Sequence, residues 1–133
     1  MPETGRILLD TSVIVAALRR VPGMMERLRG AAELLVPIAV LGELEYGANL
    51  ATPPARQHEA VRMFMEGVTL VLPTARTAAE YGRIKAALKT AGTPLPENDI
   101  WIAAVACEHR LPLATRDAHF EVIAGLTVID WRR

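Results

Sequence analysis

Five short apolar runs alternate with longer segments of helical pattern along this 133-residue chain. The runs occupy residues 6–10, 34–37, 68–72, 112–115 and 126–130. Helical periodicity covers residues 11–20, 24–33, 38–50, 52–67, 74–91, 96–110 and 118–124. Because no Asn-Gly or Asp-Gly turn joins one run to the next, the strands are not expected to pair as hairpins. This alternation predicts an α/β domain in which a parallel sheet carries helices on both faces.

The segment "LPENDIWIAAVAC" has an unusual composition for a helix. Every residue from Ile100 to Cys107 is apolar, so no side of the helix is reserved for water. Such a helix is expected to lie buried between the sheet and other helices. It nevertheless opens with Asn98 and Asp99, which places a carboxylate at the mouth of a buried element.

Two further aspartates occupy comparable positions. Asp10 ends the first strand, and Asp117 follows the strand in "LATRD". The carboxyl ends of parallel strands share one edge of the sheet with the amino ends of the helices, so Asp10, Asp99 and Asp117 are predicted to meet there. Glu43, in "AVLGELEYGA", is a fourth candidate, because on a helix it lies one turn from the small residues Ala39 and Gly47.

Each acid also has a simpler interpretation. An aspartate at a helix start caps backbone N–H groups, with Thr11 or Ser12 as further candidate caps of the first helix, and Glu43 could be a solvated helix residue. Convergence favours a site instead. Two carboxylates ~4 Å apart repel by about 4 kcal/mol at an effective dielectric of ~20, so they hold protons or bind a cation. The acids would supply only oxygen ligands, and no Cys or His residues occur at metal-binding spacing. This ligand set indicates Mg²⁺ or Mn²⁺ and not zinc.

The amino-acid composition limits the environments and partners that the protein can have. Cys107 is the only cysteine, which excludes a disulfide framework and suits a reducing cytoplasm. No stretch reaches the roughly 20 apolar residues of a membrane span, and the N-terminus lacks a signal-peptide pattern. The formal net charge is zero, so a nucleic-acid site must be a local patch. The hydrophobic fraction of 51% predicts apolar interfaces on helical stretches 14–28 and 38–64, one of them serving a homodimer.

Four blocks of the sequence together resemble a PIN domain. The blocks "ILLDTSVIVAAL", "VLGELEYGA", "NDIWIAAVA" and "LATRDAHF" occur in the order and approximate spacing of that family, from residue 7 to about residue 130. Their wording and the size of the chain are similar to VapC, the toxin of bacterial toxin–antitoxin pairs. The resemblance implies a single PIN domain over residues 1–133, built as a three-layer sandwich with a mostly parallel five-stranded sheet flanked by helices.

The resemblance also implies an activity. VapC proteins are Mg²⁺- or Mn²⁺-dependent endoribonucleases, phosphodiester hydrolases that cleave structured RNA such as tRNA or rRNA and leave a 5′-phosphate and a 3′-hydroxyl. By position, Asp10, Glu43, Asp99 and Asp117 match the four catalytic, metal-binding acids. Ser12 and Thr115 match hydroxyls that orient those acids, and Asn98 matches a supporting amide. Gly42 departs from the pattern, since Ser or Thr is common before the Glu. A cognate VapB-like antitoxin would fill a groove and place a basic side chain near the acids.

Candidate RNA contacts come from arginines and one histidine. Arg19 and Arg20 follow the first helical stretch, and Arg116 adjoins Asp117, although any of the three could simply be solvated. Of the three histidines, His119 is the best placed to touch substrate, whereas His58 and His109 are scattered elsewhere.

Several alternatives stay open. An aspartyl phosphotransfer or receiver domain would need an acid two residues after Asp10, where the chain has Ser12. A non-catalytic binding module of the same fold would use the acids as helix caps. A PIN nuclease of RNA processing would share the chemistry without being a toxin, and a metal-free histidine nuclease would leave cyclic phosphates.

Overall fold

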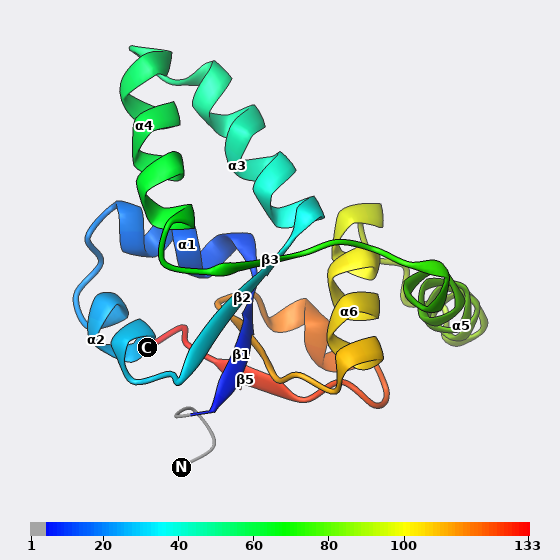
Figure 1. Ribbon diagram of the computed structural model, residues 1–133. Coiled ribbons are helices and arrows are strands. Elements are labelled where there is room, and N and C mark those ends of the chain that lie inside the picture. Colours follow the sequence, from blue (N-terminus) through cyan, green and yellow to red (C-terminus); the bar gives the residue numbers. More distant parts are fainter. Residues whose placement is uncertain (1–4) are drawn as a thin grey trace.

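A five-stranded parallel sheet forms the centre of the molecule (Figure 1). The computed structural model describes residues 5–133. The strands are β1 (Arg6–Leu9), β2 (Glu33–Pro37), β3 (Thr69–Val71), β4 (Leu113–Thr115) and β5 (Val128–Asp130). Their order is β3-β2-β1-β4-β5, and every neighbouring pair is parallel. The α/β prediction is confirmed, with a sheet that is wholly rather than mostly parallel.

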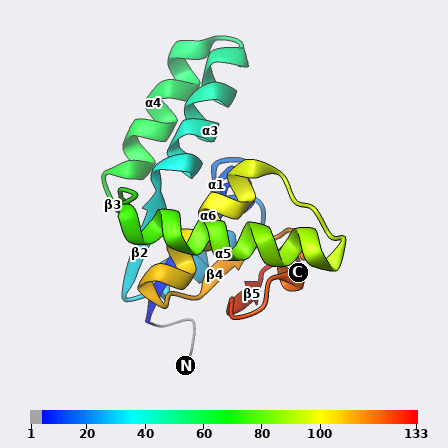
Figure 2. The ribbon, with the colours of Figure 1, turned by 90° about the vertical axis from the view of Figure 1, so that its right-hand side faces the viewer.

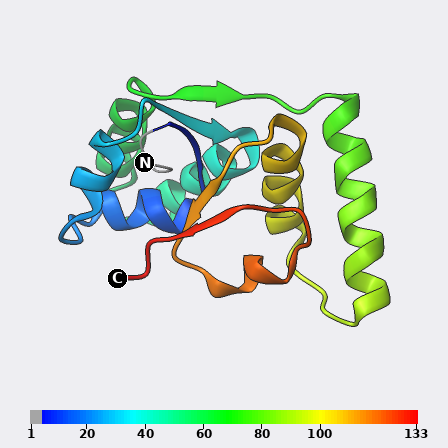
Figure 3. The same cartoon turned by 90° about the horizontal axis from the view of Figure 1, so that it is seen from below.

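Helices cover both faces of this sheet. They are α1 (Thr11–Leu18), α2 (Met24–Arg29), α3 (Ile38–Leu50), α4 (Pro54–Met65), α5 (Ala75–Ala91), α6 (Glu97–His109) and the 3-10 helix η2 (Ala118–Val122). Seen from below, α1 and α2 lie on one side of the strands and α5 and α6 on the other (Figure 3). The antiparallel pair α3–α4 extends beyond the end of the sheet (Figure 2). This is the layered arrangement that the alternating pattern predicts.

The core is built on β1 and α6. Ile7, Leu8 and Leu9 of β1 are fully buried because this strand is central and covered on both faces. In α6, Ile100 and all of Ile102 to Ala106 are buried against the sheet and the neighbouring helices, as its apolar composition predicts. Since α6 is held so firmly, its first turn is a rigid support for Asp99.

The helix expected at residues 24–33 is shorter than predicted. Helix α2 ends at Arg29, and Glu33 belongs instead to β2. There it lies opposite Arg6 of β1, whose Nε donates to Glu33 Oε1 at 2.9 Å, and it also accepts from Thr69 of β3. Three adjacent strands are therefore joined through one carboxylate, a cross-strand interaction that helical periodicity cannot reveal.

The apolar surplus is divided between the core and the surface. In the stretch 14–28, Ile14, Met24 and Leu28 are buried in the core, while Val15 and Leu18 line a surface pocket and Met25 is exposed. The stretch 38–64 does leave large apolar side chains exposed on α3 and α4, including Tyr46, Leu50 and Met63. Within residues 5–133, no helix combines the length and the apolar character needed to cross a bilayer.

Candidate active site

All four predicted acids line one pocket at the carboxyl edge of the sheet. The pocket has a volume of about 670 Å³. Its walls are formed by Asp10, Thr11, Ser12, Glu43, Pro96, Glu97, Asn98, Asp99, Asp117 and His119. These residues come from four places in the chain: the β1–α1 junction, α3, the start of α6, and the segment from the end of β4 into η2. The structure thus brings the acids together as the strand and helix ends predict.

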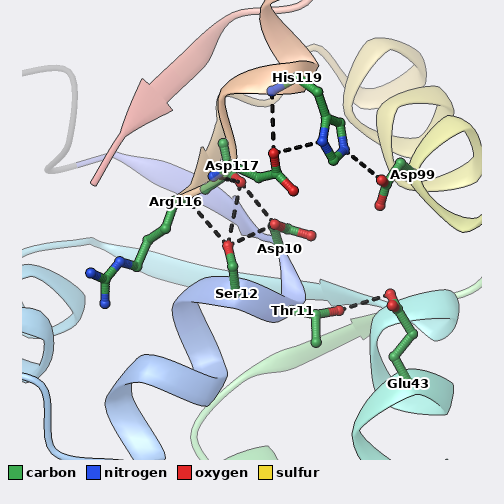
Figure 4. A network of polar contacts seen from close by, with 9 residues as sticks. Asp10, Thr11, Ser12, Glu43, Asp99, Arg116, Asp117 and His119 are labelled. Carbon is green, nitrogen blue, oxygen red and sulfur yellow. Dashed lines mark hydrogen bonds and ion pairs between the residues drawn. The ribbon is translucent and has the colours of Figure 1, made fainter. Parts of the chain in front are cut away.

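Asp10 is held in place by two hydroxyl groups. The residue is 5% exposed, and its Oδ2 accepts hydrogen bonds from Ser12 Oγ and from Thr115 Oγ1, both at 2.8 Å (Figure 4). Each hydroxyl in turn accepts a hydrogen bond from the backbone. The N–H of Arg116 donates to Ser12 Oγ and the N–H of Asp117 donates to Thr115 Oγ1, both at 2.9 Å. These paired bonds fix the orientation of the carboxylate relative to the pocket.

The expected caps of α1 are absent. Asp10 is the N-cap residue, but neither it nor another side chain makes a cap hydrogen bond there. The hydroxyls of Thr11 and Ser12 bond to acids instead, Thr11 to Glu43 and Ser12 to Asp10. The prediction that Thr11 or Ser12 caps this helix is therefore wrong, and so is the interpretation of Asp10 as a cap.

Glu43 points inward from α3. Its Oε1 accepts from Thr11 Oγ1 at 2.8 Å, across the gap between α3 and the start of α1 (Figure 4). Partial burial raises the pKa of Glu43, the Thr11 hydrogen bond opposes that rise, and the charges of Asp99 and Asp10 add to it. A freely solvated helix residue would have none of these neighbours, so that interpretation of Glu43 does not hold.

Asp99 lies at the first turn of α6 with its side chain 15% exposed. Burial raises the pKa of Asp99, and a hydrogen bond and the charge of His119 lower it. The negative charges of Asp10 and Asp117 raise it further, which requires all three acids to share one electrostatic environment. The structure therefore contains the mutual repulsion that the sequence predicts at this edge.

His119 bridges two of the acids. Its Nε2 lies 2.6 Å from Asp99 Oδ2, and its Nδ1 lies 2.6 Å from Asp117 Oδ1. Asp117 also caps η2 by accepting the backbone N–H of His119 at 3.2 Å. Sequence reasoning placed His119 near the site but missed the bridge, for which its position two residues after a capping aspartate is the available signal.

The donor chemistry of this pocket suits a hard divalent cation. Four carboxylates supply oxygen ligands of the kind that Mg²⁺ and Mn²⁺ prefer. In the part of the chain that the structure describes, however, no three His, Cys, Asp or Glu side chains converge as a group that could hold an ion. Asp99 and Asp117 are directed at His119 instead. The residues fit a cation by their chemistry, and in this structure His119 engages one oxygen of each of these two acids.

The remaining predicted site residues lie at or near this pocket. Asn98 lines it from the first turn of α6. Arg116 is joined to it through its backbone, while its guanidinium extends past α1 (Figure 4). Arg19 and Arg20 are exposed at the end of α1. His58 contacts Glu45 and Asn49, and His109 lies near Glu108, so neither of these histidines joins the acids.

A second pocket adjoins the first. It has a volume of about 350 Å³ between α1, α3 and the start of α4. Its lining is mostly apolar and consists of Val15, Leu18, Arg19, Glu43, Leu44, Gly47, Ala48, Leu50, Ala51 and Gln57. Glu43 lines both pockets, so the apolar groove leads directly to the acids.

Comparison with known proteins gives consistent matches over nearly the whole chain. Residues 7–126 match the family model described as PIN domain. The chain is 30% identical over 129 residues to a ribonuclease VapC of Haemophilus influenzae, a match that covers 95% of this chain and 98% of the relative. A tRNA(fMet)-specific endonuclease VapC of Shigella flexneri is 27% identical over 129 residues with the same coverage. The crystal structure of DNA-bound VapBC from Salmonella typhimurium superposes with a TM-score of 0.89 at 28% identity, covering 95% of this chain and 98% of that chain.

Proposed function

The chain belongs to the PIN-domain family and, within it, to the VapC ribonuclease toxins of VapBC toxin–antitoxin systems, and on this premise we propose that it hydrolyses RNA with a divalent cation held by Asp10, Glu43, Asp99 and Asp117. The observation that supports this most strongly is the convergence of these acids, which are far apart in sequence, on one pocket. Mg²⁺ is the expected ion, and Mn²⁺ should substitute for it.

Each acid has a distinct part in the proposed reaction. Asp10 is the fixed ligand, because Ser12 and Thr115 orient its carboxylate. Asp99 and Asp117 complete the ligand set from the opposite wall, and Glu43, with its raised pKa, is suited to accept a proton from the attacking water. When bound, the cation supplies positive charge that neutralises the scissile phosphate and activates that water. The expected products carry a 5′-phosphate and a 3′-hydroxyl.

We infer that the substrate is a structured RNA, a tRNA or an rRNA. The Shigella flexneri relative is named a tRNA(fMet)-specific endonuclease, which supports this class without fixing the RNA for this chain. The four acids repel phosphates, so positive charge must come from the rim of the pocket. The candidates are Arg116, whose backbone is joined to the site, Arg19, which lines the adjoining groove, and Arg20 beside it at the end of α1.

We propose that a VapB-like antitoxin binds in the apolar groove between α1, α3 and α4. Leu18 and Leu50 offer apolar contacts there, and Glu43 stands where the groove meets the acids. An amphipathic helix or an extended tail lying in this groove would bring a basic side chain to the carboxylates and so replace the cation.

A homodimer would account for the remaining apolar surface. Tyr46 and Met63 are exposed on the α3–α4 pair, and Leu70 and Leu72 are exposed at the β3 edge of the sheet. Contiguous apolar surface on a small protein marks an interface, and twofold symmetric dimers are the commonest assembly. Sedimentation of the purified chain tests this part of the proposal.

The central test is cleavage of RNA by purified protein with Mg²⁺, with Mn²⁺ and with EDTA. We expect cleavage that depends on the divalent ion, and a loss of at least ~100-fold for Asp10→Asn or Asp99→Asn, the order seen when a key electrostatic group is removed. Asp130→Asn is the matched control, because this exposed acid is the last residue of the edge strand β5 and does not line the pocket.

The alternatives give different results in the same assay. Cleavage that survives chelation and leaves cyclic phosphates would indicate a histidine nuclease. Complete absence of cleavage with either ion would indicate a binding module. Wild-type cleavage by Asp10→Asn would show that the site is wrongly assigned. Harmless expression of an active nuclease in bacteria would favour RNA processing over toxicity.

A further inference from the structure

We propose that His119 is a positioning residue that competes with the divalent cation for Asp99 and Asp117, and so sets the cation concentration at which the site assembles. This inference rests on the proposed function, because it assumes that these acids are the ligands. It concerns a side chain that the four-acid description of the site does not include.

The geometry that carries the proposal is a ring placed between two carboxylates. His119 Nε2 and Nδ1 each lie 2.6 Å from a carboxylate oxygen, Oδ2 of Asp99 and Oδ1 of Asp117. The close-up shows the ring in the space between these two side chains (Figure 4). Mg²⁺ requires its oxygen ligands at about 2.0–2.1 Å. A cation bridging the same two oxygens would need the space that the imidazole fills, so the two modes of binding exclude each other.

The electrostatics explain why the ring occupies this place. Asp99 lies in a partly buried environment with the charges of Asp10 and Asp117 nearby. His119 Nε2 makes a hydrogen bond with Asp99, and Nδ1 lies within ion-pair distance of Asp117, so one ring contacts two of the three acids at once. In the absence of a cation, His119 therefore occupies the space between these carboxylates that the cation would take.

The surroundings of His119 allow it to leave. Its side chain is 33% exposed and lies at the pocket rim on the short 3-10 helix η2, with one face tilted against buried Phe120 at 5.0 Å between ring centroids. Rotation toward solvent would empty no part of the core. Asp10 has no contact with His119 and is held separately by Ser12 and Thr115. Asp10 is thus already oriented for a cation, whereas Asp99 and Asp117 become available to it only when His119 leaves.

Two other roles for His119 predict different effects of its removal on cation binding. If the imidazole ligates the cation directly, its removal should weaken cation binding. If it only fastens η2 to α6, its removal should lower thermal stability and leave the affinity for the cation unchanged. Competition predicts that removal strengthens binding, because Asp99 and Asp117 are then free to turn to the ion.

The experiment is calorimetric titration of Mn²⁺ into the purified chain at one fixed pH, with thermal unfolding of each variant as a second readout. We expect His119→Ala to bind Mn²⁺ about tenfold more tightly than wild type, which corresponds to about 1.4 kcal/mol. His119→Gln, which keeps one donor for one carboxylate, should lie between the two. His58→Ala is the matched control, since His58 also contacts a carboxylate, that of Glu45, but neither residue lines the pocket, and it should match wild type.

Unchanged or weaker Mn²⁺ binding by both His119 variants would overturn the competition. Asp10→Asn and Asp99→Asn separate that result from failure of the proposed function. If these variants bind Mn²⁺ less tightly than wild type while the His119 variants bind it equally, the metal site stands and the competition is wrong. If they bind Mn²⁺ as wild type does, the metal site itself is wrong.

Discussion

Replacing Thr115 by valine should destabilise the protein far more than removing the equivalent hydroxyl at Ser12. Thr115 is 1% exposed, and its Oγ1 both donates to Asp10 Oδ2 and accepts the N–H of Asp117. Valine keeps the shape of the side chain and removes both bonds. A hydrogen bond to a charged group contributes about 1.5–3 kcal/mol, and a backbone N–H left without a partner adds about 1 kcal/mol or more. We therefore expect a loss of about 3 kcal/mol.

Ser12 provides the internal comparison. Its hydroxyl makes the same kind of pair, donating to Asp10 and accepting the N–H of Arg116, but it lines the open pocket. Water can replace the hydroxyl there, so Ser12→Ala should cost only about 1 kcal/mol. The difference between the two variants depends on solvent access and not on the number of bonds.

Urea unfolding followed by circular dichroism, in buffer containing EDTA, measures both costs. Thr115→Ser retains the hydroxyl and loses only a methyl group, so it should cost about 1 kcal/mol. In the Asp10→Asn background the cost of Thr115→Val should fall by about a third, because only the bond to Asp10 changes and bonds to a charged acceptor are roughly twice as strong as neutral ones. Equal costs for the Thr115→Val and Ser12→Ala variants, or an unchanged cost in the Asp10→Asn background, would refute this reasoning.

Three further results are expected. Burial opposes the hydrogen bonds from Thr77 and Thr74 at Glu108, yet the net effect lowers the pKa of this carboxyl. The stability that it contributes is therefore present above its unfolded pKa and is lost as pH falls through the lower folded value, so Glu108→Gln should flatten the acid side of a plot of urea midpoint against pH. Thr74→Ala removes the N-cap of α5 together with a bond to Glu108, should cost about 1–2 kcal/mol, and should speed hydrogen exchange in the first turn. Leu50→Glu, at a groove residue that is 68% exposed, should abolish co-purification with the antitoxin without loss of stability, whereas Met63→Glu, exposed outside the groove, should not.

The fold could be predicted from local sequence patterns because apolar residues recur with one period in helices and with another in strands. Helix α3 occupies residues 38–50 as its pattern predicts, and α5 begins at the Thr74 cap and ends before Gly92, where a φ of 72° suits glycine. Without hairpin turns, the strands had to be joined by crossovers, and all of them are parallel. The error at residues 30–33 arose because Glu33 is fixed by partners on other strands.

The acids could be predicted for a different reason. The ends of strands and helices in a parallel sheet lie at one edge whatever the details, so topology alone brings Asp10, Asp99 and Asp117 together. Topology does not determine where a hydroxyl or an imidazole points. Local capping rules have the hydroxyls of Thr11 and Ser12 accept N–H groups of α1, but in the structure both hydroxyls donate to carboxylates, because bonds to a charged acceptor are stronger than neutral ones.

The way in which the acids are satisfied leaves room for a cation. Within residues 5–133, the two hydroxyls bonded to Asp10 share Oδ2, and Thr11 bonds to Oε1 of Glu43, so each acid retains one oxygen for another ligand. These bonds can persist when an ion enters. The contacts of Asp99 and Asp117 differ, because one ring bridges both and lies between them. If the ion binds as proposed, it would have to displace a single side chain. That requirement is why the exchange of His119 for the cation should be measurable as one equilibrium, without unfolding of the frame that holds Asp10.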